Sequence, residues 1–281
     1  MDIAIRPMRR EEVDVAIELA ALEGWNPGLH DAACFHAADP GGFLVAEHRG
    51  ATVGCIAAVS YGGRFGFIGL YIVVPAYRGR GIGRMLWDAG MARLAGHVIG
   101  LDGVPAQQAY YRRNGFRLAW QNARFVGPAR PLGAPEAAAI VPLADVDFDL
   151  LCQDDARVFP APREAFLRCW TRMPGAAGLA WVEQGRLVGW GVVRPCREGH
   201  KIGPLVADRP EVARAIYQSL GARVPDGDAV FLDIPLPHAA AVALTQRQGL
   251  QRVFETARMY AGPEPRLALD RIYGITSFEL G

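Results

Sequence analysis

The sequence predicts an α/β (α+β) fold that is present twice, each copy a mixed, mostly antiparallel sheet flanked by helices. Two observations predict it. Short apolar strands alternate with amphipathic helices in the first half, and the same succession of segments returns in the second half. With 281 residues, 51% of them hydrophobic, the chain is long enough for two domains that each bury a core.

An internal repeat organises the chain. Four pairs of segments occur in the same order at separations of 131 to 135 residues, which is hard to obtain by chance. Between the copies, the stretch 127–139 is rich in Pro, Gly and Ala, as linkers often are. We therefore predict a first domain at 1–127, a linker at 128–139 and a second domain at 140–281. The matched pairs are Gly54 with Gly189, Leu101-Asp102 with Leu232-Asp233, Gly115-Phe116 with Gly249-Leu250, and 123–126 with 257–260.

Hydrophobic periodicity predicts the elements of the first copy. Val13, Ile17 and Leu22 recur at helical spacing, whereas 67–74 is a continuous apolar run suited to the centre of a sheet. The expected elements are a strand at 3–6, a helix at 11–22, a loop and helix at 25–42, a hairpin of strands at 43–47 and 53–61, a strand at 67–74, a helix at 83–95, a strand at 97–101, a short helix at 106–113, and the last strand or strands at 116–126.

Composition excludes several classes of function. A formal net charge of +1 gives no electrostatic basis for binding nucleic acid or an anionic membrane. The five cysteines are scattered, and His36, His97 and His238 show no ligand spacing, so we expect neither a disulfide scaffold nor a metal site. No run of about 18 apolar residues is present. We therefore expect a soluble cytoplasmic protein.

A glycine-rich turn stands between the apolar strand at 67–74 and the helix at 83–95. Glycines allow positive φ and close approach of a ligand, and a helix start offers unpaired N–H groups and the positive end of a dipole. This combination suits a pyrophosphate. The turn is neither a Walker A loop nor a GxGxxG motif, and taken alone it is also compatible with an ordinary turn. It reads Arg78-Gly79-Arg80-Gly81-Ile82-Gly83-Arg84.

Two motifs together resemble those of the GCN5-related N-acetyltransferase (GNAT) superfamily. Arg78-x-x-Gly81-x-Gly83 resembles its acetyl-CoA motif, and the segment from Tyr111 to Phe116 resembles its second motif, Tyr-x-x-x-Gly-Phe. The motifs occur in the right order, with a helix and a strand between them. The resemblance covers about 3–126 through motifs and about 140–260 only through the repeat. The layout is similar to bacterial tandem GNAT proteins whose divergent second domain follows a standard first one.

The resemblance implies acetyl-CoA as the cofactor. Ile72, Val73 and Val74 would present backbone groups to the pantetheine and to the thioester carbonyl. The turn 78–84 would hold the pyrophosphate. Gln107 stands where the superfamily often has Asn, and it is a candidate cofactor contact, with simple solvent exposure as the alternative.

The resemblance also implies a general acid. Tyr111 would protonate the leaving thiolate, because a phenol with a pKa of about 10 keeps its proton at pH 7. A buried aromatic side chain beside Phe116 is the alternative interpretation. The interval from Asp102 to Gly115 is shorter than the corresponding interval in the second copy, so we expect the helix that carries Tyr111 to begin late.

Weaker signals indicate the general base and the acceptor site. Asp102 ends a strand beside the expected cleft and is the first candidate for the base, although a loop or helix-capping aspartate explains it as well. Glu23 and Asp31 are further candidates. In this superfamily the segment after the first helix usually lines the acceptor pocket, which indicates Trp25, His30 and Asp31 as acceptor contacts.

The second copy departs from both motifs. The stretch 201–211 has no glycine-rich turn and contains Pro210, which lacks an N–H donor, and Thr245 stands where the tyrosine would be. We therefore expect no cofactor site there. The second domain could still complete the acceptor pocket, with core packing or exposure as the alternative for its three candidates, Trp181, Trp190 and His200.

These observations predict an acetyl-CoA-dependent N-acetyltransferase that acts on a small amine or an amino-acid-like acceptor. A non-catalytic acyl-CoA-binding sensor is the alternative, and a protein acetyltransferase, which needs a wide open groove, is a third interpretation. The expected partner is a small-molecule amine, with no nucleic acid and no membrane. Nothing in the sequence indicates the oligomeric state.

Overall fold

The computed structural model describes residues 2–129 and 140–281, so most of the predicted linker lies outside the described residues. Each element predicted in the first copy is present, with bounds shifted by at most two residues. The first copy contains β1 (Ala4–Pro7), α1 (Arg10–Leu22), α2 (Asp31–Ala38), β2 (Phe43–His48), β3 (Ala51–Tyr61), β4 (Phe65–Val73), η1 (Pro75–Tyr77), α3 (Ile82–Arg93), β5 (Val98–Gly103), η2 (Pro105–Gln107), α4 (Gln108–Arg113) and β6 (Arg117–Pro128).

The second copy repeats this order of elements and adds a short strand at its end. α4 has six residues and its counterpart α8 has nine, so the helix that carries Tyr111 does begin late, as predicted. The second copy contains β7 (Ile140–Pro142), η3 (Leu143–Asp145), α5 (Phe148–Asp155), α6 (Glu164–Trp170), β8 (Ala177–Glu183), β9 (Arg186–Pro195), β10 (His200–Ala207), α7 (Pro210–Gly221), β11 (Ala229–Pro235), α8 (Ala239–Arg247), β12 (Gln251–Ala261), η4 (Leu269–Arg271) and β13 (Ile272–Gly274).

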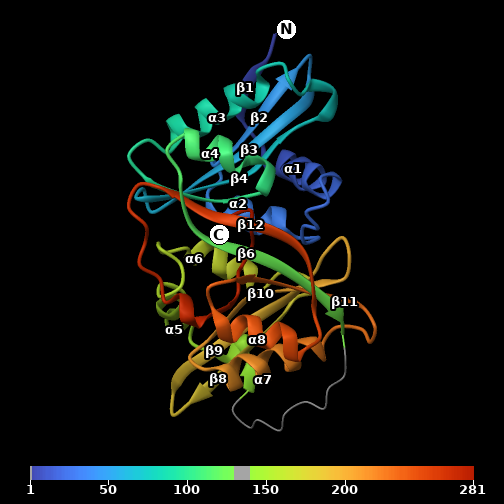
Figure 1. Cartoon of the computed structure of the whole chain (residues 1–281), viewed down its shortest axis with the longest axis vertical. Helices are drawn as coiled ribbons and strands as arrows, with labels where there is room; N and C mark the ends of the chain where they lie inside the picture. Colours follow the sequence, from blue (N-terminus) through green and yellow to red (C-terminus); the bar gives the residue numbers. More distant parts are fainter. Residues whose placement is uncertain (1, 130–139) are drawn as a thin grey trace.

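The two copies share one sheet, and each gives its last long strand to the other. The order is β1-β2-β3-β4-β5-β12-β6-β11-β10-β9-β8-β7, with β13 beside β10. β12 therefore pairs with β5 of the first copy, and β6 pairs with β11 of the second. Both strands cross the middle of the molecule in Figure 1. The predicted domain boundary at 127 separates the two copies in the sequence, whereas a single sheet contains strands of both copies.

A local twofold relation connects β6 with β12. These antiparallel strands place Asn122 opposite Thr256, its own counterpart in the repeat, and Asn122 Nδ2 donates to Thr256 Oγ1 at 3.4 Å. From this pair outward, the strands run from β5 to β1 on one side and from β11 to β7 on the other. The symmetric order confirms the predicted duplication.

Helices cover both faces of the sheet (Figure 1). α3 packs on one face of the first copy through Leu86 and Trp87, and α7 packs on the second copy through Ile216. α1, α2, α5 and α6 pack on the opposite face. Phe67 and Ile68 are adjacent in β4 yet belong to different cores, because successive strand residues point to opposite faces.

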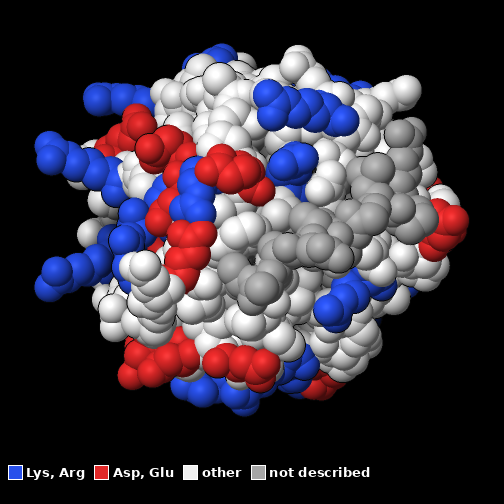
Figure 2. All heavy atoms as spheres, turned by 90° about the horizontal axis from the view of Figure 1, so that it is seen from below, with Lys and Arg blue, Asp and Glu red and all other residues white. Residues whose placement is uncertain are grey.

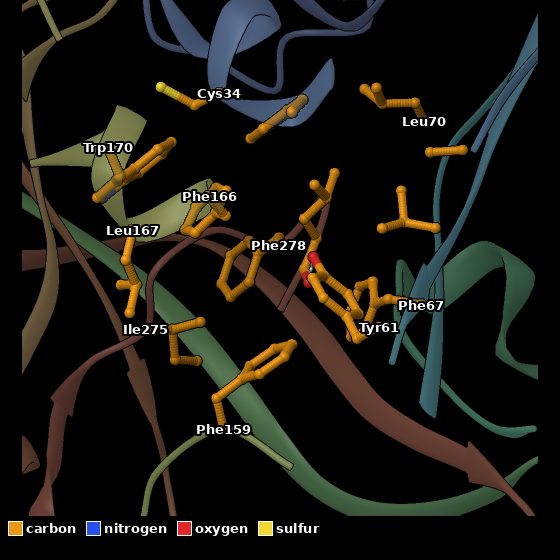
Figure 3. Close-up of a cluster of buried hydrophobic side chains, with 14 of the residues drawn as sticks. Cys34, Tyr61, Phe67, Leu70, Phe159, Phe166, Leu167, Trp170, Ile275 and Phe278 are labelled. Atoms are coloured by element: carbon orange, nitrogen blue, oxygen red, sulfur yellow. Dashed lines mark hydrogen bonds between the residues drawn. The ribbon is translucent and has the colours of Figure 1, made fainter. Parts of the chain in front are cut away.

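The core under α1, α2, α5 and α6 is built from both halves of the chain. Phe35 of α2 stacks on Trp170 of α6, with ring centroids 6.2 Å apart. Figure 3 shows Phe278, close to the chain end, among aromatic side chains of the two halves, with Phe166 from α6 and Tyr61 from β3 nearby. The two copies therefore form one packed unit rather than two independent domains.

An opening separates the ends of two parallel strands in the first copy but is filled in the second. β4 and β5 pair only as far as Ile68 and Leu101. β10 and β11 likewise pair only as far as Ile202 and Leu232, but there β13 pairs with β10, and Ile275 N donates to the main-chain oxygen of Asp233. Among the described strands, space between a parallel pair thus remains in the first copy, which has no counterpart of β13.

The surface seen in Figure 2 carries acidic and basic side chains next to one another. Many of the charged groups elsewhere on the described surface are also paired, as Arg84 is with Asp88 and Arg10 with Asp14. Among the described helices, none combines the length and the apolar character that a membrane crossing requires.

Candidate functional site

A cavity of about 380 Å³ lies where β4 and β5 separate. The first half supplies most of its lining, and four residues come from the second half. These lining residues are Glu23, Trp25, Ile68, Gly69, Leu70, Tyr71, Ile72, Val73, Arg78, Leu101, Asp102, Val104, Ala106, Gln107, Tyr111, Phe254, Thr256, Phe278 and Glu279.

A bulge in β4 exposes main-chain groups to this cavity. Two residues of β4, Leu70 and Tyr71, lie opposite the single residue Ile56 of β3. Leu70 has a φ of 47°, which a leucine adopts only when the surrounding structure imposes it. Ile72 and Val73, two of the predicted backbone contacts, line the cavity just beyond the bulge. Val74 does not line it, and its N–H donates to the main-chain oxygen of Val53 at 3.0 Å.

The glycine-rich turn leaves a row of N–H groups unpaired. Among the described residues, none accepts a hydrogen bond from a main-chain N–H of residues 79–84. Gly79 and Gly81 have φ values of 74° and 83°, and a Cβ on either would meet nothing within 4 Å. α3 begins directly after Gly81, so its dipole adds to the positive potential. The turn therefore fits a diphosphate.

The arginines of the turn differ in their contacts. Arg78 lines the cavity, donates from Nε to the main-chain oxygen of Val73 at 2.8 Å and pairs with Glu23. Arg80 lies over the ring of Tyr77, 5.5 Å from its centroid. Arg84 pairs with Asp88 on the next turn of α3. The three arginines belong to the same turn as the row of N–H groups, and so the residues present fit coenzyme A.

Tyr111 lies in the wall of the cavity, on the short helix α4. Its side chain is 7% exposed and packs 5.5 Å from the ring of Trp87. Burial raises the pKa of Tyr111 above its ordinary value, so the phenol remains a proton donor. Gln107 also lines the cavity, and its contact with the cofactor stays a prediction.

Asp102 lines the cavity, but its carboxylate is already engaged. Arg258 of β12 donates to both of its oxygens, at 2.9 and 2.8 Å, and Asn122 donates to Oδ1 at 2.8 Å. Burial raises the pKa of Asp102, and the charge of Arg258 opposes that shift. A carboxylate held on both oxygens is poorly placed to accept a further proton, so the geometry favours a structural role.

The structure brings only one of the three predicted acceptor contacts to the cavity. Trp25 lines it. His30 is exposed at the start of α2, and Asp31 is fully buried in a bidentate ion pair with Arg194 of β9. Neither His30 nor Asp31 reaches the cavity, because the turn before α2 directs them to the surface and to the second copy.

The second half does shape the cavity, through residues that sequence reasoning missed. Trp190 is buried and donates to Asp154, Trp181 donates to Glu183, and neither they nor His200 line the cavity. The residues that do so are Phe254 and Thr256 of β12 and Phe278 and Glu279 near the chain end. One available signal was the largely apolar run 272–280, which has no counterpart in the first copy.

Comparisons with known proteins agree with this geometry. A model of an acetyltransferase (GNAT) domain matches residues 39–118, and another model of the same description matches 151–274. The chain is 29% identical to holothin acyltransferase of Pseudoalteromonas sp. (strain SANK 73390) over 98% of this chain and 94% of that protein.

Two solved structures share the fold. A putative acetyltransferase from Pyrococcus horikoshii superposes with a TM-score of 0.85 at 23% identity, covering 99% of this chain and 96% of that one. A tandem GNAT protein from the clavulanic acid biosynthesis pathway superposes with a TM-score of 0.67 at 16% identity, covering 94% and 100%. The two-copy architecture is therefore present in other solved proteins.

Proposed function

Because the chain is a tandem member of the GCN5-related N-acetyltransferase (GNAT) superfamily, we propose that it transfers an acetyl group from acetyl-CoA to a small amine or amino-acid-like acceptor. The likeness to a holothin acyltransferase over nearly the whole of both chains supports acyl transfer. Catalysis by such an enzyme depends on holding the two reactants in line and on a proton path.

One observation carries the proposal: Arg78 lines the cavity and also directly precedes the row of unpaired N–H groups. The turn 79–84 would hold the diphosphate of the cofactor, and the bulged segment of β4 would receive its pantetheine and thioester end. Such preorganised donors act without reorganisation at the moment of reaction.

The proposed roles follow from the chemistry of transfer. When bound, acetyl-CoA would supply an activated acyl carbon. The acceptor nitrogen would form a bond to that carbon and lose one proton, while the carbon–sulfur bond breaks and the sulfur takes up one proton. Tyr111 holds that proton on its hydroxyl, because burial keeps the phenol neutral. Asp102 maintains the sheet through its pairing with Arg258.

We also propose that the cofactor binds only the first copy. In the second copy β13 occupies the corresponding opening, and a Cβ on Gly203 would come within 2.5 Å of the main-chain oxygen of Ile275. α7 begins at Pro210, so the first residue of that helix has no N–H to offer.

A thiol-release assay with acetyl-CoA and a panel of amines, amino acids and amino-acid amides tests the function. Acceptor-dependent release of one thiol per turnover is the expected result. The engagement of Asp102 favours the second candidate, a non-catalytic acyl-CoA sensor. Tight, saturable acetyl-CoA binding without thiol release in the presence of any acceptor would refute the enzyme and support the sensor.

A further inference from the structure

Glu279 is a buried residue in the wall of the cavity, and one oxygen of its carboxylate has no partner among the described residues. Glu279 is 3% exposed, and its Oε2 accepts no hydrogen bond from any residue that the structure describes. We propose that Glu279 binds the amino group of the acceptor, which is then a small primary amine with an aromatic or apolar body. This inference deepens the proposed function and rests on it, since it names the acceptor class of the same site.

Glu279 differs from the other buried carboxylates around it. Both oxygens of Asp233 are held by Arg124, at 2.7 and 2.8 Å, and both oxygens of Asp31 are held by Arg194, at 2.8 and 3.1 Å. A buried polar group without a partner is costly, and a bound ligand or ion is one way in which such a group is satisfied. Glu279 therefore has binding capacity that the folded chain does not use.

Nearby cations hold the Glu279 carboxylate in a positive environment without pairing with it. Burial lowers the pKa of Arg124, but the charges of Asp233 and Glu279 raise it above its ordinary value. Arg194 holds Asp31 through Nε and Nη2 and keeps an Nη1 without a partner among the described residues, and Lys201 donates from Nζ to the main-chain oxygen of Asn26 at 3.0 Å. None of these three cations donates a hydrogen bond to the carboxylate, so its oxygens can still accept from a ligand.

Aromatic side chains beside Glu279 indicate the rest of the ligand. Arg124 donates to the main-chain oxygen of Trp25 at 2.6 Å, and its guanidinium lies 5.6 and 5.3 Å from the rings of Phe254 and Phe278. All three aromatic residues line the cavity. Rings of this kind bury the apolar body of a ligand, while the carboxylate of Glu279 is the group that receives its ammonium. A primary amine with a benzyl-like body matches both features.

The segment 275–281 that carries Glu279 is held at several points. Tyr61 donates from its hydroxyl to the main-chain oxygen of Leu280 at 3.2 Å, and Arg163 donates to that of Gly281 at 3.1 Å. Leu280 N donates to Ser277 Oγ at 3.1 Å. A carboxylate on a fixed main chain can recognise a ligand without first being ordered.

The test measures equilibrium binding of benzylammonium and of its neutral analogue benzyl alcohol to the full chain without cofactor. At pH 7.5 the amine is protonated, since alkyl ammonium groups have pKa values of about 10. The wild type should bind the cation at least about tenfold more tightly than the alcohol, as expected for a hydrogen bond to a charged group. Glu279→Gln should remove this preference and leave the affinity for the alcohol within about twofold.

A matched control makes the same exchange elsewhere. Glu264 is exposed and does not line the cavity, so Glu264→Gln should bind both probes like the wild type. Glu279→Asp keeps the charge and should retain part of the preference. Should Glu279→Gln fail to fold, the affinities of the wild type and of Glu279→Asp for the two probes still test the proposal.

Three results would overturn the proposal. They are no binding of benzylammonium to the wild type, equal affinity of the wild type for both probes, and an equal loss of affinity for both probes in a folded Glu279→Gln protein. Thiol release is measured separately with the amine panel. An absence of release from wild type that keeps its preference for the cation refutes only the transferase, whereas release with an unchanged KM for benzylamine in Glu279→Gln refutes only the role of Glu279.

Discussion

Asp102 of β5 and Arg258 of β12 form a buried bidentate ion pair, with Nε–Oδ1 and Nη2–Oδ2 distances of 2.9 and 2.8 Å. Asp233 of β11 and Arg124 of β6 form the same pair on the other side of the local twofold. In the repeat, Asp102 corresponds to Asp233 and Arg258 to Arg124. Each copy therefore supplies an aspartate that the arginine of the other copy neutralises.

Removing one partner of this pair should destabilise the sheet that the two copies share. Arg258→Ala leaves Asp102 buried with only Asn122 as a donor, and we expect the free energy of unfolding to fall by about 3–5 kcal/mol. Arg252→Ala is the control, because Arg252 lies on the same strand in an exposed pair with Glu255, where a change under about 1 kcal/mol is expected. Urea unfolding of both variants measures the difference, and similar losses would contradict the assignment.

Gly69 should tolerate no side chain. A Cβ at this position would collide with the main-chain oxygen of Glu279, so Gly69→Ala must displace the segment 275–281. We expect a loss of about 1–3 kcal/mol in unfolding free energy, the usual cost of overpacking. Gly221→Ala, where a Cβ meets nothing within 4 Å, should be neutral or slightly stabilising. Equal stabilities of the two variants would show that the segment does not pack against β4 as described.

Gly81→Val should abolish acetyl-CoA binding. A β-branched residue is strained at a φ of 83°, and its side chain would enter the space in front of the unpaired N–H groups. Gly50→Val is matched, because Gly50 has a φ of 81° and equally open surroundings in the turn between β2 and β3. Calorimetric titration should find the loss only in Gly81→Val. Wild-type affinity in that variant would remove the cofactor site from this turn.

Tyr111→Phe should lower kcat by roughly 10–100-fold, the usual scale of general acid catalysis, with acetyl-CoA affinity within about twofold of wild type. Because burial raises the pKa of Tyr111, the wild-type rate should not decline through loss of this proton below about pH 10. Tyr110→Phe is the control, since Tyr110 does not line the cavity. If turnover in Tyr111→Phe matches that in Tyr110→Phe, another group protonates the thiolate.

The sequence by itself determined the duplication, the succession of strands and helices, and the glycine-rich turn at 78–84. The elements and the turn follow from local periodicity and from glycines that need positive φ, so neighbouring residues are enough to recognise them. The duplication follows from matched segments 131 to 135 residues apart. Tyr111 could be located from a short motif one helix and one strand beyond the turn, and Gln107 from the place where the resembling superfamily often has Asn.

Only the tertiary structure decided which strands pair and what completes the cavity. Since β6 and β12 carry equivalent residues, Arg124 or Arg258 could pair with either aspartate, and the local pattern does not distinguish the exchanged sheet from two separate ones. Glu279 lies 177 residues after Asp102 in the chain, so no spacing rule connects them. Its position follows from β13, which fills the opening in the second copy and directs the chain end into the first.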